Sequence, residues 1–208
     1  MKKLILIFLV MFISCVNQSN ENDDQKDKII GDSSFMDGAD LSYVNEMEDC
    51  GATYKNLNNN FEDVFHIFKN SGAEIIRVRL WNNPKWTNYS NLDDVKKTIR
   101  RSKELGMKVL LDFHYSDTWA DPKKQIIPKD WENSIGKTIE LGGLLYSYTQ
   151  SVLKELVQEN LKPDIVQVGN EINTMLLQEE NNHSEKIDWN RNSYLINKGI
   201  SAIRDLNQ

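Results

Sequence analysis

The feature that most constrains this chain is the alternation of short apolar runs with amphipathic helical stretches. Each run is rich in β-branched residues, and in each following stretch apolar residues recur every three or four positions. Strands that alternate with helices in this way are typical of βαβ units and a parallel sheet. The expected strands are residues 36–44, 75–81, 108–114 and 166–173, and the expected helices are 61–72, 92–105, 141–158 and 192–206.

The chain therefore holds four successive β-then-α units. A complete (β/α)8 barrel needs eight such units and about 250 residues. An open doubly wound sheet is the competing architecture, but it would favour a glycine-rich phosphate loop after the first strand, and the sequence has none there. We expect an α/β fold equivalent to the N-terminal half of a TIM barrel, with two unpaired strand edges and poor stability on its own.

The N-terminal segment has the layout of a bacterial lipoprotein-type signal peptide over residues 1–14. Two lysines precede an apolar run that is short for a membrane span, and Cys15 follows. We expect Cys15 to carry a lipid, with simple secretion as the alternative. Residues 15–34 are mostly polar and acidic, and we expect a disordered linker. The exported domain, 35–208, would then lie at the bacterial cell surface or in the periplasm.

Composition excludes several classes of function. The formal net charge of -6 and the pI of about 5.2 argue against a nucleic-acid partner, which would require a basic patch. The mean hydropathy of -0.56, with no long apolar run beyond the N-terminus, excludes a polytopic membrane protein. Five Trp, seven Tyr and seven Phe are compatible with sugar stacking, and equally with an ordinary core.

An Asn-Glu pair directly follows the apolar run of the fourth expected strand. In a parallel barrel the active site forms at the C-terminal ends of the strands, so Glu171 is a candidate catalytic residue. The alternative is that Glu171 caps the next helix. The long segment 115–135, which is rich in Trp, Asp, Lys and Pro, follows the third strand, and loops of that length are usually functional.

Charged residues also occupy the second and third expected strands. Strand alternation places Arg77 and Arg79 on one face, and likewise Asp112 and His114. Buried charges must be paired, so we expect Arg79, Asp112 and His114 to form an inward network around Glu171. An internal salt-bridge layer without a catalytic role is the alternative.

Four sequence strings, each at a strand end, resemble glycoside hydrolase family 53. They are GADLSYVNEMEDCGA at 38–52, VRLWNNP at 78–84, LLDFHYSDTWADPKKQ at 110–125 and VQVGNEIN at 166–173. The family comprises endo-β-1,4-galactanases that act on arabinogalactan and on galactan side chains of pectin. The resemblance runs from Met36 to the C-terminus and covers only the N-terminal part of the family's domain.

The resemblance implies a role for each strand-end residue. Glu171 would be the general acid/base of a retaining glycosidase, and burial would have to raise its pKa toward about 6 to 7. Asn170 would bind the sugar 2-hydroxyl, and Arg79, or Arg77 by the same parity, would orient the nucleophilic carboxylate. The remaining substrate-binding candidates are His114, Asp117, Trp119 and Asp40.

The family's nucleophile is a Glu at the end of a seventh strand, which these four units do not include. Glu179, Glu180 and Glu185 lie in a polar stretch that is typical of solvated surface, so none of them should replace it. We expect no cofactor and no metal here, since the calcium of some relatives would involve the missing half. The alternatives are a non-catalytic glycan-binding lipoprotein and a retaining hydrolase of the same superfamily that acts on mannan or glucan.

Overall fold

The structure, a computed structural model, describes residues 35–179 and 187–206. The expected signal peptide, Cys15 and the linker therefore lie outside the described residues, as do Glu180 and Glu185. Contacts group the rest of the chain into one compact unit, Met36–Gln208. Within its described part, no helix is long and apolar enough to cross a membrane.

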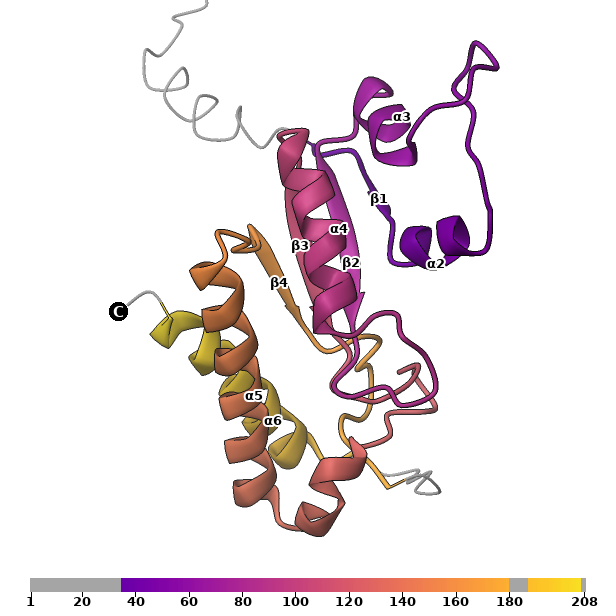
Figure 1. The fold of residues 1–208 in the computed structure, drawn as a ribbon. Coiled ribbons are helices and arrows are strands. Elements are labelled where there is room, and N and C mark those ends of the chain that lie inside the picture. The colour runs from indigo at the N-terminus through magenta and orange to yellow at the C-terminus, as the bar shows by residue number, and fades with distance from the viewer. Residues whose placement is uncertain (1–34, 180–186, 207–208) are drawn as a thin grey trace, which may run out of the picture. The chain divides into compact units, whose positions relative to one another are not determined.

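Four parallel strands form one sheet in the order β1-β2-β3-β4 (Figure 1). Their bounds are Gly38–Asp40 for β1, Ile75–Leu80 for β2, Lys108–Phe113 for β3 and Ile165–Val168 for β4. Strand order follows chain order, and a helix lies between each strand and the next. This confirms the expected succession of four βα units.

The helices are α2 (Val44–Asp49), α3 (Val64–Asn70), α4 (Leu92–Glu104), the 3-10 helix η1 (Lys129–Ser134), α5 (Thr138–Gln158) and α6 (Trp189–Asp205). Three of them begin at a side chain that accepts main-chain N–H groups of the first turn. The capping residues are Asp63 for α3, Asn91 for α4 and Asp188 for α6. Such caps satisfy N–H groups that have no partner inside the helix.

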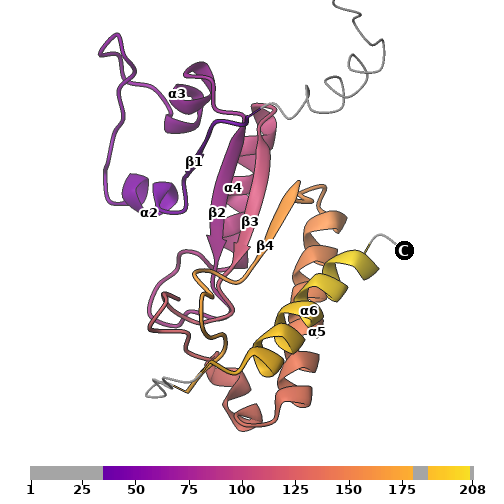
Figure 2. The same cartoon turned by 180° about the vertical axis from the view of Figure 1, so that it is seen from behind.

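The two faces of the sheet differ sharply. Alternate residues of β2 and β3, such as Val78 and Leu111, are fully buried in the apolar core. Helix α4 packs on β2 and β3, and α6 packs on β4 and against α5 (Figures 1 and 2). The intervening residues, among them Arg77 and Asp112, belong to the opposite face of the sheet. No described helix packs on that face (Figure 2).

The first strand is much shorter than the predicted run 36–44. The Asp40 side chain accepts hydrogen bonds from the main-chain N–H and the hydroxyl of Ser42, and α2 begins at Val44. A local Asp side-chain bond of this kind turns the chain, so the strand stops at Asp40. The acidic residues after Val44 belong to a helix that the sequence pattern did not reveal.

The fourth strand also ends early, at Val168 rather than within 166–173. Gly169 and Glu171 have φ angles of 88° and 50°, in the left-handed region, where a strand cannot continue. Helices α5 and α6 each begin three residues before the predicted starts, at Thr138 and Trp189. The Asp188 cap accounts for the earlier start of α6.

Candidate active site

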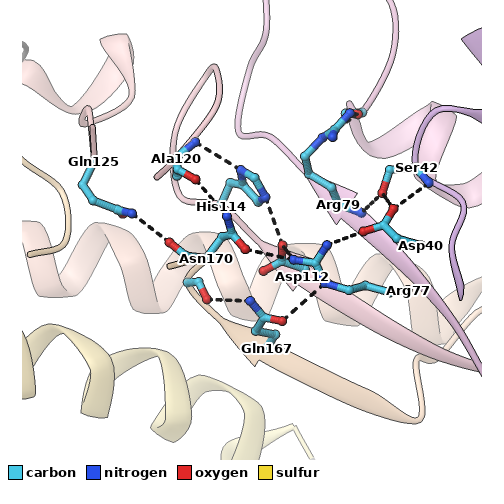
Figure 3. Close-up of polar contacts among 12 residues, drawn as sticks. Asp40, Ser42, Arg77, Arg79, Asp112, His114, Ala120, Gln125, Gln167 and Asn170 are labelled. Atoms are coloured by element: carbon cyan, nitrogen blue, oxygen red, sulfur yellow. Dashed lines mark hydrogen bonds and ion pairs between the residues drawn. The ribbon is translucent and has the colours of Figure 1, made fainter. Parts of the chain in front are cut away.

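Arg77 lies at the centre of a polar group on the open face of the sheet (Figure 3). Its guanidinium forms ion pairs with Asp40 on β1 and Asp112 on β3. It also donates to Asn170 Oδ1 at 2.9 Å and to Gln167 Oε1 at 3.5 Å, both from the segment of β4. One side chain from β2 therefore joins groups contributed by the other three strands.

Asp112 and His114 form a buried pair beside Arg77. His114 Nε2 lies 3.0 Å from Asp112 Oδ2, and the side chains are 1% and 0% exposed. His114 Nδ1 accepts the main-chain N–H of Ala120 at 3.4 Å, so in the neutral ring Nε2 carries the proton and faces the carboxylate. Asp112 Oδ1 is buried with no hydrogen bond from the described residues. The expected pairing of Asp112 with His114 is confirmed.

The Asn170 side chain has a fixed orientation. Its Oδ1 accepts from Arg77, so its Nδ2 is the donor, and it reaches the carbonyl of Ala120 at 2.8 Å. The main-chain carbonyl of Asn170 accepts from Gln125 Nε2 at 2.7 Å. Both contacts from the β3 loop tie the end of β4 to the residues that follow β3, which stiffens the start of the Asn-Glu pair.

Glu171 follows this fixed residue but is itself exposed. None of the hydrogen bonds or ion pairs found among the described residues involves its carboxylate, and its backbone is in the left-handed region with φ of 50°. The structure therefore differs from the expectation that burial surrounds this carboxyl. Glu171 thus directly follows a member of the Arg77 group in the chain, but its own side chain is exposed.

Arg79 does not join the network that the sequence led us to expect. Its side chain is directed away from Arg77 (Figure 3), and its Nη2 donates to Ser90 Oγ at 2.9 Å. It is 4% exposed, and burial lowers the pKa of its guanidinium below the usual value. Arg77 and Arg79 have the same parity on β2, so alternation alone could not separate them. Arg77 is the arginine of the Asp112 network, and the assignment of Arg79 to that network was wrong.

Asp117 and Trp119 lie on the loop after β3. Both carboxylate oxygens of Asp117 accept main-chain N–H groups, from Asn83 at 2.9 Å and from Lys129 at 2.8 Å. Asp117 thus links three loop segments. Trp119 is 39% exposed and lies edge-on to His114, with 6.0 Å between ring centroids, so its ring borders the Asp112 network.

The charge on Asp40 is stabilised by its neighbours. Burial raises the pKa of its carboxyl, but hydrogen bonds from Ser42 and the ion pair with Arg77 outweigh burial, so the pKa lies below its usual value. Among the described residues, no group of three or more His, Cys, Asp or Glu side chains could hold a metal ion. Sequence reasoning missed Ser42, Gln125 and Gln167, although all three lie inside the strings that carry the resemblance.

The parallel βα sheet, with an arginine, carboxylates and an Asn-Glu pair at its strand ends, defines part of a (β/α)-barrel domain of the glycoside hydrolase type. The chain belongs to glycosyl hydrolase family 53, whose profile matches residues 36–208.

Relatives support this assignment in sequence and in structure. An arabinogalactan endo-β-1,4-galactanase of Cellvibrio japonicus is 48% identical over 99% of this chain and 52% of its own length. An endo-β-1,4-galactanase of Bacillus subtilis is 38% identical over 83% of this chain and 40% of its own. The catalytic domain of an Ignisphaera aggregans member of the family superposes with a TM-score of 0.74, at 34% identity, over 83% of this chain and 49% of that one. The chain thus spans about half the length of the relatives it matches.

Proposed function

We propose that this chain supplies the acid/base half of the active site of an endo-acting, retaining β-1,4-galactanase. The observation that carries the proposal is the set of contacts from Arg77 to Asp40, Asp112 and Asn170, which fixes the residue next to Glu171 at the end of β4. The galactanase names of the relatives support galactan, in arabinogalactan or in pectin side chains, as the substrate.

In this proposal Glu171 is the general acid/base. A retaining glycosidase needs one carboxyl that protonates the leaving oxygen and then removes a proton from water. An exposed Glu171 can exchange that proton with water between the two steps. Asn170 Nδ2 has two hydrogens and uses one on the Ala120 carbonyl, so the second can bind a sugar hydroxyl.

The nucleophile must be a second carboxylate, about 5 to 5.5 Å from the acid/base. Asp40 and Asp112 are the carboxylates of the Arg77 group, but Arg77 holds each in an ion pair, which lowers its tendency to attack carbon. We therefore assign the nucleophile to the part of the domain that the longer relatives have and this chain does not cover. Arg77, with its side chain 30% exposed, would face that carboxylate.

The other strand-end residues would contact or shape the substrate. Trp119 offers a half-exposed ring for stacking on a galactose face, and His114 borders it. Asp117 would act by holding its loop, since both of its carboxylate oxygens accept main-chain N–H groups. Export and a lipid on Cys15 complete the proposal and rest on the N-terminal sequence alone. Loss of membrane association in Cys15→Ser, with Cys50→Ser as the matched control, would test the anchor.

The test of the activity uses the full-length protein and reducing-sugar release from β-1,4-galactan. Glu171→Gln should lower kcat about 10²- to 10⁴-fold, the usual contribution of a general acid/base. Glu179→Gln, an exposed Glu eight positions further along the chain, should leave kcat unchanged. In Glu171→Ala, added azide should restore turnover of a substrate with a good leaving group and give a product of retained configuration, because azide needs no base to attack the glycosyl-enzyme.

Two outcomes would contradict the proposal in different ways. Equal or faster release of sugar from mannan or glucan would agree with a hydrolase activity but would contradict the assignment of galactan as the substrate. Galactan binding without any hydrolysis would favour the non-catalytic glycan-binding alternative.

A further inference from the structure

Arg79 is a buried cation surrounded by aromatic rings instead of carboxylates. Its guanidinium carbon lies 4.1 Å from the ring centroid of Trp119, 4.4 Å from that of Trp81 and 4.7 Å from that of Tyr43. No Asp or Glu in the described part of the chain forms an ion pair with it. Three ring faces within such distances attract a cation through their quadrupoles.

The guanidinium is held in place from the side of the sheet. Its Nε and Nη2 both donate to Ser90 Oγ, at 3.2 and 2.9 Å. Ser90 is itself fixed, because its main-chain N–H donates to Asp94 Oδ2 at 2.7 Å. The main-chain N–H of Arg79 donates to Ser42 Oγ at 2.9 Å, which ties β2 to the turn after β1. The planar group therefore has little freedom to rotate.

The three rings around it differ in exposure. Trp81 is buried, at 2% exposed, whereas Tyr43 and Trp119 are 45% and 39% exposed. Ring centroids lie 5.9 Å apart for Tyr43 and Trp119, and 5.6 Å apart for Trp81 and Trp119. Tyr43 and Trp119 come from different strand ends, β1 and β3, and the guanidinium contacts both.

We propose that Arg79 is a positioning residue that holds Tyr43 and Trp119 together as one sugar-binding platform at the edge of the active site. The inference rests on the proposed galactanase function and deepens it. The platform borders the Asp112 network, because His114 packs edge-on to Trp119. Ala120 follows Trp119 in the chain, and its carbonyl accepts from Asn170 Nδ2, so a galactosyl unit stacked on these rings would lie beside the Asn170 amide.

Packing alone does not explain an arginine here. A buried charge without a counter-ion is costly, and an apolar side chain of similar length would fill the same space without that cost. What an apolar residue cannot supply is the attraction of a cation to three ring faces together with two hydrogen bonds to one hydroxyl. The arrangement therefore favours a role in fixing ring orientation.

The test compares Arg79→Met and Arg79→Lys with the wild type in the full-length protein, using β-1,4-galactan oligosaccharides. Methionine is unbranched like arginine but removes the guanidinium and its charge, so KM should rise about 10-fold while kcat changes less than about 3-fold. Lysine keeps the charge but lacks the planar guanidinium, so the KM of Arg79→Lys should lie between those of the wild type and Arg79→Met. A purely structural role would lower Tm without this selective effect on KM.

A second readout needs no substrate. With 5-fluorotryptophan in place of tryptophan, the fluorine resonance of Trp119 should be single and narrow in the wild type, and broadened or split in Arg79→Met. Trp119→Phe assigns the resonance. The matched control is Lys198→Met, because Lys198 also lies over a ring, that of Tyr194 at 5.4 Å, within α6. That variant should leave both KM and the Trp119 signal unchanged.

Each outcome decides the matter. An unchanged KM in Arg79→Met, or an unchanged Trp119 resonance, would overturn the positioning role. If Arg79→Met does not fold, Arg79→Lys decides, because a wild-type KM in that variant would also overturn it. A wild type that does not hydrolyse galactan would defeat the proposed function and with it the sugar platform, whereas the fluorine signal would still report whether Arg79 orders the ring.

Discussion

Arg77 forms ion pairs with two carboxylates, so its substitution should lower the stability of the protein as well as its activity. Asp112 is fully buried, and without Arg77 its remaining polar partner among the described residues is His114. Leaving a buried charge without its counter-ion typically costs about 3 to 5 kcal/mol. The contact to Asn170 would disappear with it, which would loosen the residue next to Glu171.

Arg77→Met should accordingly lower the free energy of unfolding by about 3 kcal/mol, as measured by urea denaturation of the full-length protein. The matched control is Arg100→Met, because Arg100 pairs with Glu159 on the helix surface and its side chain is 51% exposed. Loss of that exposed pair should cost less than about 1 kcal/mol. Similar losses of unfolding free energy in the two variants would show that the ion pairs of Arg77 do not stabilise the strand-end network.

Asp40 gives the site a pH-dependent contribution to stability. Its pKa in the folded protein lies below the ordinary value of an aspartate, so the folded state binds this proton less readily than the unfolded state. The contribution is complete above the unfolded pKa and is lost as pH falls through the folded one. The difference in unfolding free energy between wild type and Asp40→Asn should thus be constant at neutral pH and shrink below a pH of about 4.

Urea denaturation at several pH values between 7 and 2 measures that difference. Its size at neutral pH should stay near or below about 1 kcal/mol, because the Asp40 side chain is 41% exposed and solvent screens it. A difference that grows as the pH falls would contradict the assignment of the Asp40 charge to the folded state.

At the residue scale, sequence predicted part of the site. Period-two alternation correctly placed Asp112 and His114 on one face, and their pairing followed from burial. Alternation could not choose between Arg77 and Arg79. The choice depends on Asp40, Tyr43 and Trp119, which other segments bring to the two guanidinium groups, so no local pattern contains it.

The elements were predictable in type and order because each buries an apolar face of the right period. Their ends were less so. The strand at β1 stops where Asp40 bonds to Ser42, and β4 stops where Gly169 turns left-handed. Single side-chain bonds and single dihedral angles set these ends, and a periodicity averaged over many residues cannot detect them.

Helix α6 approaches β4 very closely at Gly199. A Cβ added there would lie 2.6 Å from Val168 Cγ1, which is closer than packed side chains allow, and 3.2 Å from Leu145 Cδ2, which is tighter than most packed contacts. Gly199→Ala should therefore lower the free energy of unfolding by about 1 to 3 kcal/mol, the usual range for overpacking. Because Val168 directly precedes Gly169, a shifted α6 should also disturb the Asn-Glu turn and reduce kcat.

Gly143→Ala is the matched control, since this glycine is in α5 and nothing lies within 4 Å of its added Cβ. That change should be neutral or should stabilise the protein by up to about 1 kcal/mol, the difference in helix propensity. Thermal unfolding and reducing-sugar assays of both variants would test the contrast. Equal tolerance of alanine at the two positions would show that α6 can move away from β4 without cost.

On the scale of the whole molecule, the open face of the sheet determines what this chain can do alone. Besides the Arg77 group, that face carries apolar residues of the strand starts, including Ile165, which is 38% exposed. In a closed barrel such residues are covered by side chains from the remaining strands. In the described part of the chain this face of the sheet therefore stays uncovered, and the Arg77 group lies on it.

The isolated 208-residue chain should release no reducing sugar from galactan under conditions in which the full-length protein is active. The reason is that a retaining glycosidase needs a second, free carboxylate, whereas Arg77 holds both Asp40 and Asp112 in ion pairs. Assays at equal molar concentration, with Glu171→Gln in both backgrounds, would measure this. Turnover by the short chain that Glu171→Gln abolishes would refute the assignment of the nucleophile to the uncovered part of the domain.

The left-handed backbone at Glu171 has an evolutionary consequence. For a residue with a side chain, such a φ angle costs about 1 to 2 kcal/mol of conformational free energy, and asparagine tolerates it better than glutamate does. Folding alone would thus favour glycine or asparagine at position 171, whereas the acid/base role that we propose for Glu171 requires a carboxyl. Lineages that lose the need to degrade galactan should drift toward the more stable residue there first, so the identity of residue 171 in a natural homologue would serve as a record of whether hydrolysis is still under selection.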